Sequence, residues 1–434
     1  MARSCQLSIK YAGNLENRIP VDGMYVVKEK WKVSDKPECR VLQVFGNLGT
    51  GGAETWLMAI LRYLKEIESE LPVRISMHIF ITNGVRSDFD DEAKSLGATL
   101  HYSKFSRKNL LGFVRDWRRV LRQYDFHVVH DQQENTAGLH FLMGFGYLPS
   151  IRIAHLHNPL IHLQSYSSSS LRRATLWLGK FWISKLGTHI LSTSRQLICE
   201  QGYFDSKFNK LDRKAVYCGF DTSRFLGDHD SQFRSLCDEF NWPENTRIVL
   251  FVGRLHSTED DHLNQKNPAF ALDVARLCAD KNPNVRMLMV GGGESVRKRL
   301  EERVKSWGLA DRILLVGQRT DVPRFMLGSH LFLLSSIAEG LGMVVVEAQA
   351  AGLPSIVSDV TPRECTVVDE MVEFLTLNVG AEAWAAKILD MIAMERPNSI
   401  VANYAIRNSG FSIENSVKSL LECYTALSIP DVAR

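Results

Sequence analysis

Two glutamates with glycines between them form the stretch of this sequence best suited to chemistry. Glu339 ends a short apolar run, Gly340, Leu341 and Gly342 follow, and Glu347 lies within the helix expected next. Backbone amides that open a helix can hold a phosphate group, and a carboxylate on either side can accept hydrogen bonds from hydroxyls. A sugar joined to a nucleoside through a diphosphate has this layout. A surface glutamate beside an amphipathic helix is the structural alternative.

Two cations stand at a second strand-to-helix connection. Gly253 and Arg254 end an apolar run, and Lys266 opens the helix expected after it. Fixed positive charges beside a diphosphate stabilise a leaving group as its negative charge develops. Taken singly, each cation is read equally well as a solvated surface charge. The glycine turn around Gly292 has the same strand-to-helix character.

A glycine loop near the start of the chain has a related pattern. Residues 46–52 end in Gly51 and Gly52, follow an apolar run and precede a helix expected over residues 53–66. Glycines there let backbone amides approach an anion, although a plain tight turn is the favoured reading of the loop by itself. No Gly-Lys-Ser/Thr follows, which excludes a P-loop.

Histidines gather in the first half of the chain at His130, His155, His157 and His162. His155 and His157 follow a strand expected over residues 151–154, which directs both toward the edge of a cleft. We expect one of them to hydrogen-bond a substrate, while His130 is read equally well as a structural histidine. Metal binding is the minor alternative, since no Asp or Glu has the spacing of a ligand set.

Strands and helices alternate along the chain, and this order predicts how these residues are positioned. Such alternation favours parallel sheets covered by helices, whose ligands bind at the carboxyl ends of the strands. We expect an α/β protein with two Rossmann-like, doubly wound domains facing a cleft. The expected divisions are an extension that need not be ordered (1–39), an acceptor-side domain (40–222), a nucleotide-binding domain (223–396), and a crossover segment with a C-terminal helix (397–434).

Charge is distributed unevenly along the sequence. The net charge is +3, but residues 1–225 carry +10 and the remainder carries −7. Two basic stretches with interleaved aromatics, 104–122 and 171–186, suit an anionic membrane surface, although ordinary sheet-covering helices explain them equally well. No apolar run has the length of a signal peptide or a membrane span. We therefore expect a cytoplasmic protein, free or peripheral on the inner face of the cell membrane, with no nucleic-acid partner.

The ordered set of motifs resembles the retaining family 4 glycosyltransferases of the GT-B fold. The resemblance covers about residues 40–427. It is carried by Gly51-Gly52-Ala53-Glu54, His157-Asn158, Val252-Gly253-Arg254, Lys266-Asn267, the segment 316–322 and the Glu339–Glu347 element. The segment 347–364 looks like the subgroup found in bacterial exopolysaccharide clusters.

The resemblance implies an enzyme that moves a sugar from a nucleotide-diphosphate sugar to a glycan or lipid-linked acceptor, with retention of configuration and without metal or cofactor. It implies that Arg254 and Lys266 meet the diphosphate, and that Glu339 and His157 meet the donor sugar. The implied donor-binding residues are Gly51, Gly52, Gly253, Gly292, Arg319, Val322, Gly340, Leu341, Gly342 and Glu347, with Glu347 on the ribose and Arg319 to Val322 along the base pocket. The last helix is implied to cross back onto the first domain.

One departure from the family pattern keeps an alternative open. Eleven residues separate Arg254 from Lys266, more than the family usually has, and they include the acidic run Glu259-Asp260-Asp261. This insert motivates a second hypothesis, a catalytically inactive nucleotide-sugar-binding homologue or partner subunit. A phosphorylase of the same fold would need a lysine motif for pyridoxal phosphate, and none is evident.

Overall fold

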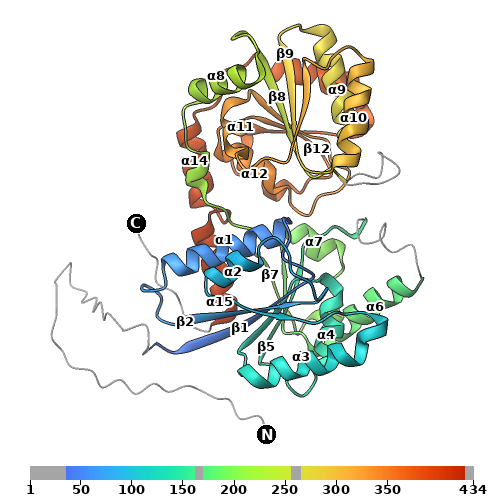
Figure 1. Cartoon of the computed structure of the whole chain (residues 1–434), viewed down its shortest axis with the longest axis vertical. Helices are drawn as coiled ribbons and strands as arrows, with labels where there is room; N and C mark the ends of the chain where they lie inside the picture. Colours follow the sequence, from blue (N-terminus) through green and yellow to red (C-terminus); the bar gives the residue numbers. More distant parts are fainter. Residues whose placement is uncertain (1–35, 162–169, 256–264, 426–434) are drawn as a thin grey trace, which may run out of the picture.

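The computed structural model describes residues 36–161, 170–255 and 265–425, which form two lobes, each built around one parallel sheet (Figure 1). The expectations for the N-terminal extension, for His162 and for nearly all of the insert after Arg254 concern residues outside these ranges. Two doubly wound sheets are what the alternating sequence pattern predicts. The expected divisions at residues 222 and 396 stay a prediction.

In the described residues, the sheet of the N-terminal lobe has seven parallel strands in the order β3-β2-β1-β4-β5-β6-β7. Its first strand begins at Glu38, two residues before the expected start, since Glu38 already pairs with Arg74 of the neighbouring strand. The strands are β1 (Glu38–Phe45), β2 (Arg74–Ile81), β3 (Thr99–Tyr102), β4 (Val128–Asp131), β5 (Ile151–Leu156), β6 (His189–Ser192) and β7 (Asp212–Ala215).

Helices cover both faces of this sheet (Figure 1). The first helix buries the apolar stripe that its sequence spacing predicts, including Trp56, Leu57 and Ile60, as expected for a helix packed on a sheet. The helices of this lobe are α1 (Gly52–Glu66), α2 (Asp90–Ser95), α3 (Leu110–Tyr124), α4 (Ala137–Met143), α6 (Ser170–Leu186) and α7 (Arg195–Glu200).

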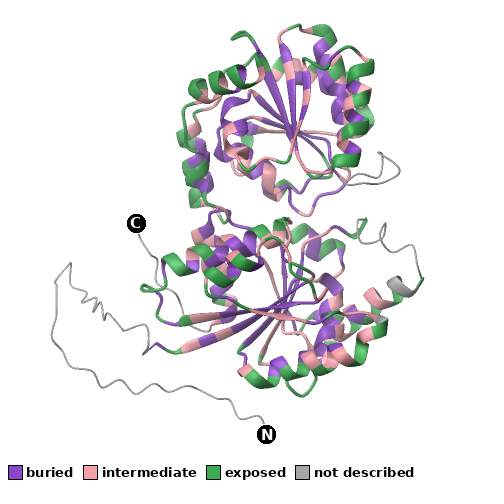
Figure 2. Ribbon diagram, in the orientation of Figure 1, coloured by how far each residue is buried: buried purple, intermediate pink, exposed green. Residues whose placement is uncertain are grey.

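The sheet of the C-terminal lobe has six strands among the described residues, in the order β10-β9-β8-β11-β12-β13, all parallel. Its central strands are nearly continuous apolar runs, because helices bury both faces (Figure 2). The elements are α8 (His229–Phe240), β8 (Arg247–Val252), α9 (Pro268–Lys281), β9 (Val285–Val290), α10 (Glu294–Ser306), β10 (Ile313–Gly317), α11 (Val322–Gly328), β11 (Leu331–Leu334), α12 (Met343–Ala350), β12 (Ser355–Ser358), β13 (Val372–Leu375) and α13 (Gly380–Met391).

The last two helices tie the lobes together. Helix α14 (Ser399–Asn408) lies on the C-terminal lobe, where the Asn403 amide donates to the carbonyl of Ala350. Helix α15 (Ile413–Tyr424) returns to the N-terminal lobe, and Trp56 of α1 donates to Ser416 over 3.0 Å. The crossover that the sequence resemblance implied is therefore confirmed.

Candidate active site

The predicted site residues lie where the two sheets turn their carboxyl ends toward each other. In the C-terminal sheet the chain leaves β8 in one direction and β11 in the other, so the loops after these neighbouring strands flank a topological switch point. Ligands of open parallel sheets bind at such points. Arg254 follows β8 and Glu339 follows β11. In the N-terminal sheet, the loops after the neighbouring strands β1 and β4 flank a second switch point.

Lys266 and Glu339 form a shielded ion pair at this switch point. Lys266 Nζ lies 2.5 Å from Glu339 Oε1, and the side chain of Glu339 is 6% exposed. The hydroxyl of Ser336 donates to the same carboxylate. Next to Lys266, Asn267 adopts a left-handed backbone and Pro268 opens α9, so the lysine stands at the head of its helix as predicted.

Glu347 lies in the second turn of α12, behind the loop that contains Glu339. Its half-buried position raises the pKa of its carboxyl to about 7, and the charges of Arg224 and Lys266 offset part of this rise. A carboxylate with such a raised pKa at a switch point is a candidate for a binding site.

Glycines let the neighbouring loops approach closely. A Cβ on Gly291 would overlap the carbonyl oxygen of Gly253, and a Cβ on Gly293, whose φ is +130°, would overlap that of Leu255. Gly292 lies against the side-chain oxygen of Gln318. The loops after β8 and β9 are therefore packed backbone to backbone beside Arg254, and the side chain of Gln318 after β10 lies against them.

The lobes touch at the glycines that open α12. A Cβ on Gly340 would overlap the carbonyl oxygen of His157, and the hydroxyl of Ser194 donates to the carbonyl of Gly340 over 2.7 Å. Leu341 is buried, and Gly342 has the left-handed φ of +86° that a cap before α12 requires. Gly340 and His157, predicted separately, are thus brought into contact.

His157 is held by groups from the segment that follows strand β4. Its backbone amide and that of Asn158 donate to one carboxylate oxygen of Glu134, while its Nε2 lies 2.7 Å from the side-chain oxygen of Gln132. Burial lowers the pKa of His157 to about 4, so its ring is neutral at physiological pH. Glu134, which sequence reasoning missed, has a left-handed φ of +54°. A single glutamate outside any motif gave no signal for this role.

His155 is not at the edge of a cleft, contrary to the prediction. Strand β5 continues to Leu156, two residues beyond the expected end, and the side chain of His155 is fully buried. It stacks on the ring of His157, with ring centroids 4.3 Å apart. His130, read as either structural or functional, is also fully buried.

The glycine loop of the N-terminal lobe faces the first cation of the other lobe. Gly51 caps α1 and Gly52 begins it. Burial raises the pKa of Glu54 in its first turn, while a hydrogen bond from its own backbone and the charge of Arg254 offset part of the rise. Arg254 itself is exposed. The charge of Arg254 therefore acts from the C-terminal lobe on a carboxyl group in the first turn of α1.

Arg319 was expected to line a pocket for the base, but its side chain binds other residues of the C-terminal lobe. Its guanidinium makes a two-pronged bond to Asp321 and a further ion pair with Glu239, and it stacks over Phe325. Val322 begins α11 directly afterwards. The side chain of Arg319 is thus held by residues of its own lobe.

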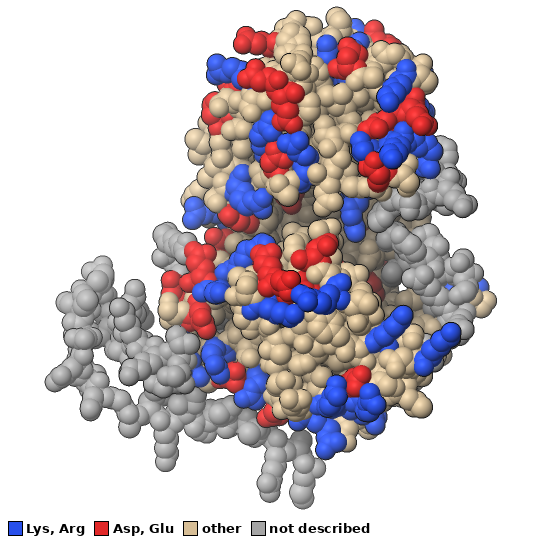
Figure 3. All heavy atoms as spheres, in the orientation of Figure 1, with Lys and Arg blue, Asp and Glu red and all other residues tan. Residues whose placement is uncertain are grey.

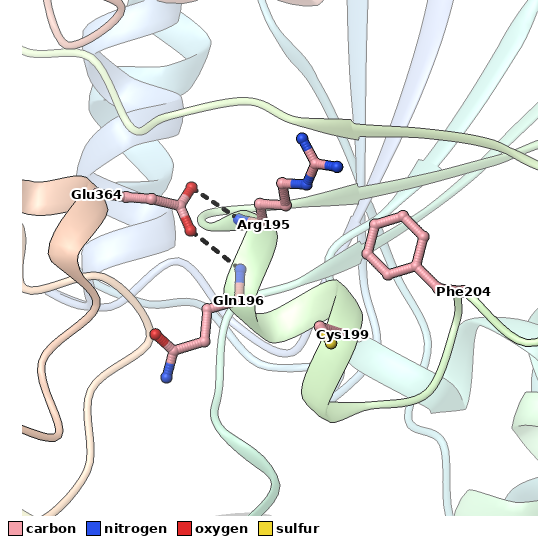
Figure 4. Close-up of a pocket in the computed structure, with 5 residues that line it drawn as sticks. All are labelled: Arg195, Gln196, Cys199, Phe204 and Glu364. Atoms are coloured by element: carbon pink, nitrogen blue, oxygen red, sulfur yellow. Dashed lines mark hydrogen bonds between the residues drawn. The ribbon is translucent and has the colours of Figure 1, made fainter.

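A second contact between the lobes was missed from the sequence. Glu364 of the C-terminal lobe accepts from the backbone amides of Arg195 and Gln196 (Figure 4). It also accepts from the hydroxyl of Tyr217. The two amides open α7, whose Ser194 cap also holds Gly340. Glu364 and Ser194 therefore fix how closely the lobes approach at the site.

Within the described residues, no cluster of three or more His, Cys, Asp or Glu side chains has the arrangement of a metal site. In the same residues, no helix combines the length and apolar character needed to cross a bilayer.

Comparisons with known proteins show which proteins this chain is similar to. Residues 233–408 match the family model described as glycosyl transferases group 1. EpsF of Bacillus subtilis (strain 168), named as a glycosyltransferase, is 25% identical over 402 residues, 89% of this chain and 96% of its own. The capsular polysaccharide biosynthesis glycosyltransferase CapH of Staphylococcus aureus is 24% identical over 394 residues, 90% of this chain and 99% of its own.

Solved structures share the architecture. HepE from Anabaena, crystallised with UDP and glucose, superposes with a TM-score of 0.68 at 17% identity, over 90% of this chain and all of its own. A glycosyltransferase from Rickettsia africae gives the same TM-score at 16% identity, over 89% of this chain and 98% of its own. Residues 233–408 of this chain therefore match the group 1 glycosyltransferases, and the chain as a whole has the GT-B fold and is similar over most of its length to glycosyltransferases that include one of capsular polysaccharide biosynthesis.

Proposed function

We propose that this protein transfers a sugar from a nucleoside diphosphate sugar to a glycan or lipid-linked acceptor, with retention of anomeric configuration. The observation that carries the proposal is the shielded Lys266–Glu339 pair, set beside Glu347 at the switch point of the C-terminal sheet. It combines a cation for a diphosphate with carboxylates for the hydroxyls on either side.

The leaving group is stabilised by fixed positive charge. In this proposal the β-phosphate lies between Arg254, Lys266 and the backbone amides that open α12. As the bond from the anomeric carbon to the phosphate oxygen breaks, the acceptor hydroxyl oxygen forms its bond on the same face. The proton of that hydroxyl passes to the departing phosphate oxygen. Preorganised donors at such a position contribute about 10²–10³ each to the rate.

The carboxylates orient the two ends of the donor. Glu339 and His157 take hydroxyls of the transferred sugar, because both border the contact between the lobes. Glu347 accepts from the ribose hydroxyls, and the backbone from Arg319 to Val322 holds the base. Gly51 and Gly52 lie across the reacting centre, close to where Arg254 approaches Glu54.

The relatives suggest the pathway and the acceptor. Of the two full-length matches, CapH is named for capsular polysaccharide biosynthesis, and an Escherichia coli enzyme that is 29% identical over 190 residues is named for galactosyl transfer from UDP-Gal to a diphosphoundecaprenol-linked sugar. We therefore place this protein in polysaccharide biosynthesis, with a lipid-linked acceptor.

A membrane-binding face on the N-terminal lobe would bring such an acceptor within reach. Helix α3 exposes Leu111 at 87% and α6 exposes Trp177 at 68%. In Figure 3, basic side chains gather at the bottom of the N-terminal lobe, where α3 lies, whereas acidic and basic groups are mixed nearer the C-terminal lobe and on that lobe itself. Exposed apolar groups among basic ones suit the surface of an anionic bilayer. We propose peripheral attachment to the inner face of the cell membrane.

A structure of the complex tests the proposed donor site. The ligand is the nucleoside diphosphate sugar, from a panel led by UDP sugars, that most raises the melting temperature. The proposal expects Arg254 and Lys266 at the diphosphate and Glu347 within hydrogen-bond distance of the ribose. A donor bound with its phosphates away from both cations contradicts it.

A further inference from the structure

A hydrogen-bonded chain of buried side chains joins the C-terminal helix to His157. Gln132 accepts from His157 Nε2 over 2.7 Å, and its amide nitrogen donates to Gln43 Oε1 over 2.9 Å. Gln43 in turn donates to the hydroxyl oxygen of Tyr424 over 2.7 Å. That hydroxyl lies 2.6 Å from Nδ1 of His130. Tyr424 is in α15, so the chain links the crossover helix to the site.

Along this series of hydrogen bonds, donors and acceptors follow one order. A glutamine amide offers an oxygen at one end and an NH₂ group at the other, and the surrounding network decides which is which. Because Gln43 donates to Tyr424, its oxygen faces Gln132, and because Gln132 donates to Gln43, its own oxygen faces His157. A neutral imidazole opposite a carbonyl oxygen must carry its proton there, which puts the proton of His157 on Nε2.

The groups of the chain are buried and neutral. Gln43 and His130 are fully buried, and Tyr424 is 3% exposed. Burial raises the pKa of Tyr424 well above its usual value and lowers that of His130 well below its own. Among the described residues, the remaining alternative acceptor for the Gln43 amide is His130 Nδ1, at a poorer distance of 3.4 Å. A buried donor without a partner is costly, so removal of the tyrosine hydroxyl favours reversal of both amides.

We propose that Tyr424 is a positioning residue for His157: through Gln43 and Gln132 it keeps the proton on Nε2 and leaves Nδ1 as an acceptor for a hydroxyl of the donor sugar. The inference rests on the proposed function, because the sugar is the ligand of that function. It gives the C-terminal helix a part in the chemistry besides joining the lobes. If the amides reverse, an NH₂ group faces Nε2, the proton moves to Nδ1 and the sugar hydroxyl loses its acceptor.

The test compares Tyr424→Phe with Tyr404→Phe, a control whose ring is exposed in α14. Long-range proton–nitrogen NMR spectra of the full chain, labelled in histidine, report which ring nitrogen of His157 is protonated. We expect Nε2 protonation in the wild type and the control, and a shift toward Nδ1 in Tyr424→Phe. We expect kcat/KM for the donor to fall about 3- to 10-fold, the size of one neutral hydrogen bond.

A second variant guards against a simple folding defect. Gln132→Met removes the hydrogen bond to His157 and leaves Tyr424 in place. The inference requires that this variant also lose the preference of the His157 proton for Nε2. The inference is overturned if His157 keeps its Nε2 proton in Tyr424→Phe, or if the wild type is protonated on Nδ1. If the wild type transfers no sugar, the proposed function fails, while the spectra still decide the inference about Tyr424.

Discussion

The Nζ of Lys266 lies 2.5 Å from Oε1 of Glu339, and this contact joins the head of α9 to the loop after β11. Neither charge is left uncompensated in the shielded pocket, where an unpaired ion would be strongly destabilising. In the proposed function, an arriving diphosphate would share the lysine, and the sugar hydroxyls would share the glutamate. The pair would then keep the proposed donor site assembled before the donor binds.

Replacing Lys266 by Met separates this structural role from the catalytic one. We expect kcat/KM to fall about 10²- to 10³-fold, because one fixed cation at the leaving group is lost. The melting temperature falls as well, because Glu339 is left buried and unpaired. The double variant Lys266→Met/Glu339→Gln removes that charge and should recover the melting temperature without recovering activity. Steady-state kinetics and thermal melts measure both effects.

The surface variant Lys298→Met is the matched control for Lys266. Lys298 is 68% exposed and pairs at 3.7 Å with Glu294, so we expect both readouts to stay at wild-type levels. Wild-type turnover by Lys266→Met would remove the lysine from the proposed mechanism.

Glu347 predicts a pH dependence of stability. Burial raises the pKa of its carboxyl from 4.5 to about 7 in the folded protein, so the protonated form is the one that folding favours. Its contribution to stability is complete below about pH 4.5 and is lost as the pH rises through about 7. Glu347→Gln should therefore melt higher than the wild type at pH 8, with a difference that shrinks toward pH 5. Exposed Glu382→Gln is the control, and a difference that does not vary with pH would refute the assignment.

We expect Glu364 to link how closely the two lobes approach to the pKa of Tyr217. Burial and the adjacent Glu364 raise the pKa of Tyr217 to about 12. Glu364→Gln should lower that pKa toward 10 and weaken the hold on the amides of Arg195 and Gln196. The lobes would then separate more readily, which small-angle scattering detects as a larger radius of gyration. Glu370→Gln, at an exposed position, is the control; identical scattering and tyrosine titration in Glu364→Gln would contradict the proposed coupling.

The membrane-binding face predicts salt-sensitive attachment to lipid. Wild-type protein should co-sediment with vesicles that contain anionic lipid, and less so as added salt screens the charges. Leu111→Asp and Trp177→Asp should each weaken this binding, since both place a negative charge on the proposed face. Ile400→Asp changes an apolar residue that is 70% exposed on the other lobe and should have no effect. Binding that ignores lipid charge and salt would count against this face.

The sequence predicted the parts of the fold that local pattern determines. Apolar runs such as residues 248–251 indicate buried strands because helices cover both faces of a parallel sheet. Strand β7 was missed because Asp212, Arg213 and Lys214 form a polar edge with no apolar run. Helices α7 and α14 were missed too, and α14 exposes Ile400 and Val401 where an amphipathic pattern would place polar residues.

The site was predicted less completely than the fold. Glycines and charges at strand ends are visible locally, so Glu339, Gly340 and Lys266 could be assigned to one site. Glu134, Glu364 and Tyr424 act through partners far away in the chain, and their contacts arise only when the strands and lobes are packed together. The position of His155 was predicted wrongly for a related reason. Strand β5 extends two residues further than expected, so His155 lies within the strand and its side chain is buried.

Release of nucleoside diphosphate tests the central claim most directly. Wild type, Arg254→Ala and Lys298→Met are incubated with a panel of nucleoside diphosphate sugars, with and without lipid-linked acceptors, and the released diphosphate is quantified. The account predicts release from at least one donor by wild type and by Lys298→Met, and about 10²-fold less by Arg254→Ala. Folded wild-type protein that binds a donor but releases nothing with any acceptor would contradict it and favour an inactive nucleotide-sugar-binding homologue or partner subunit.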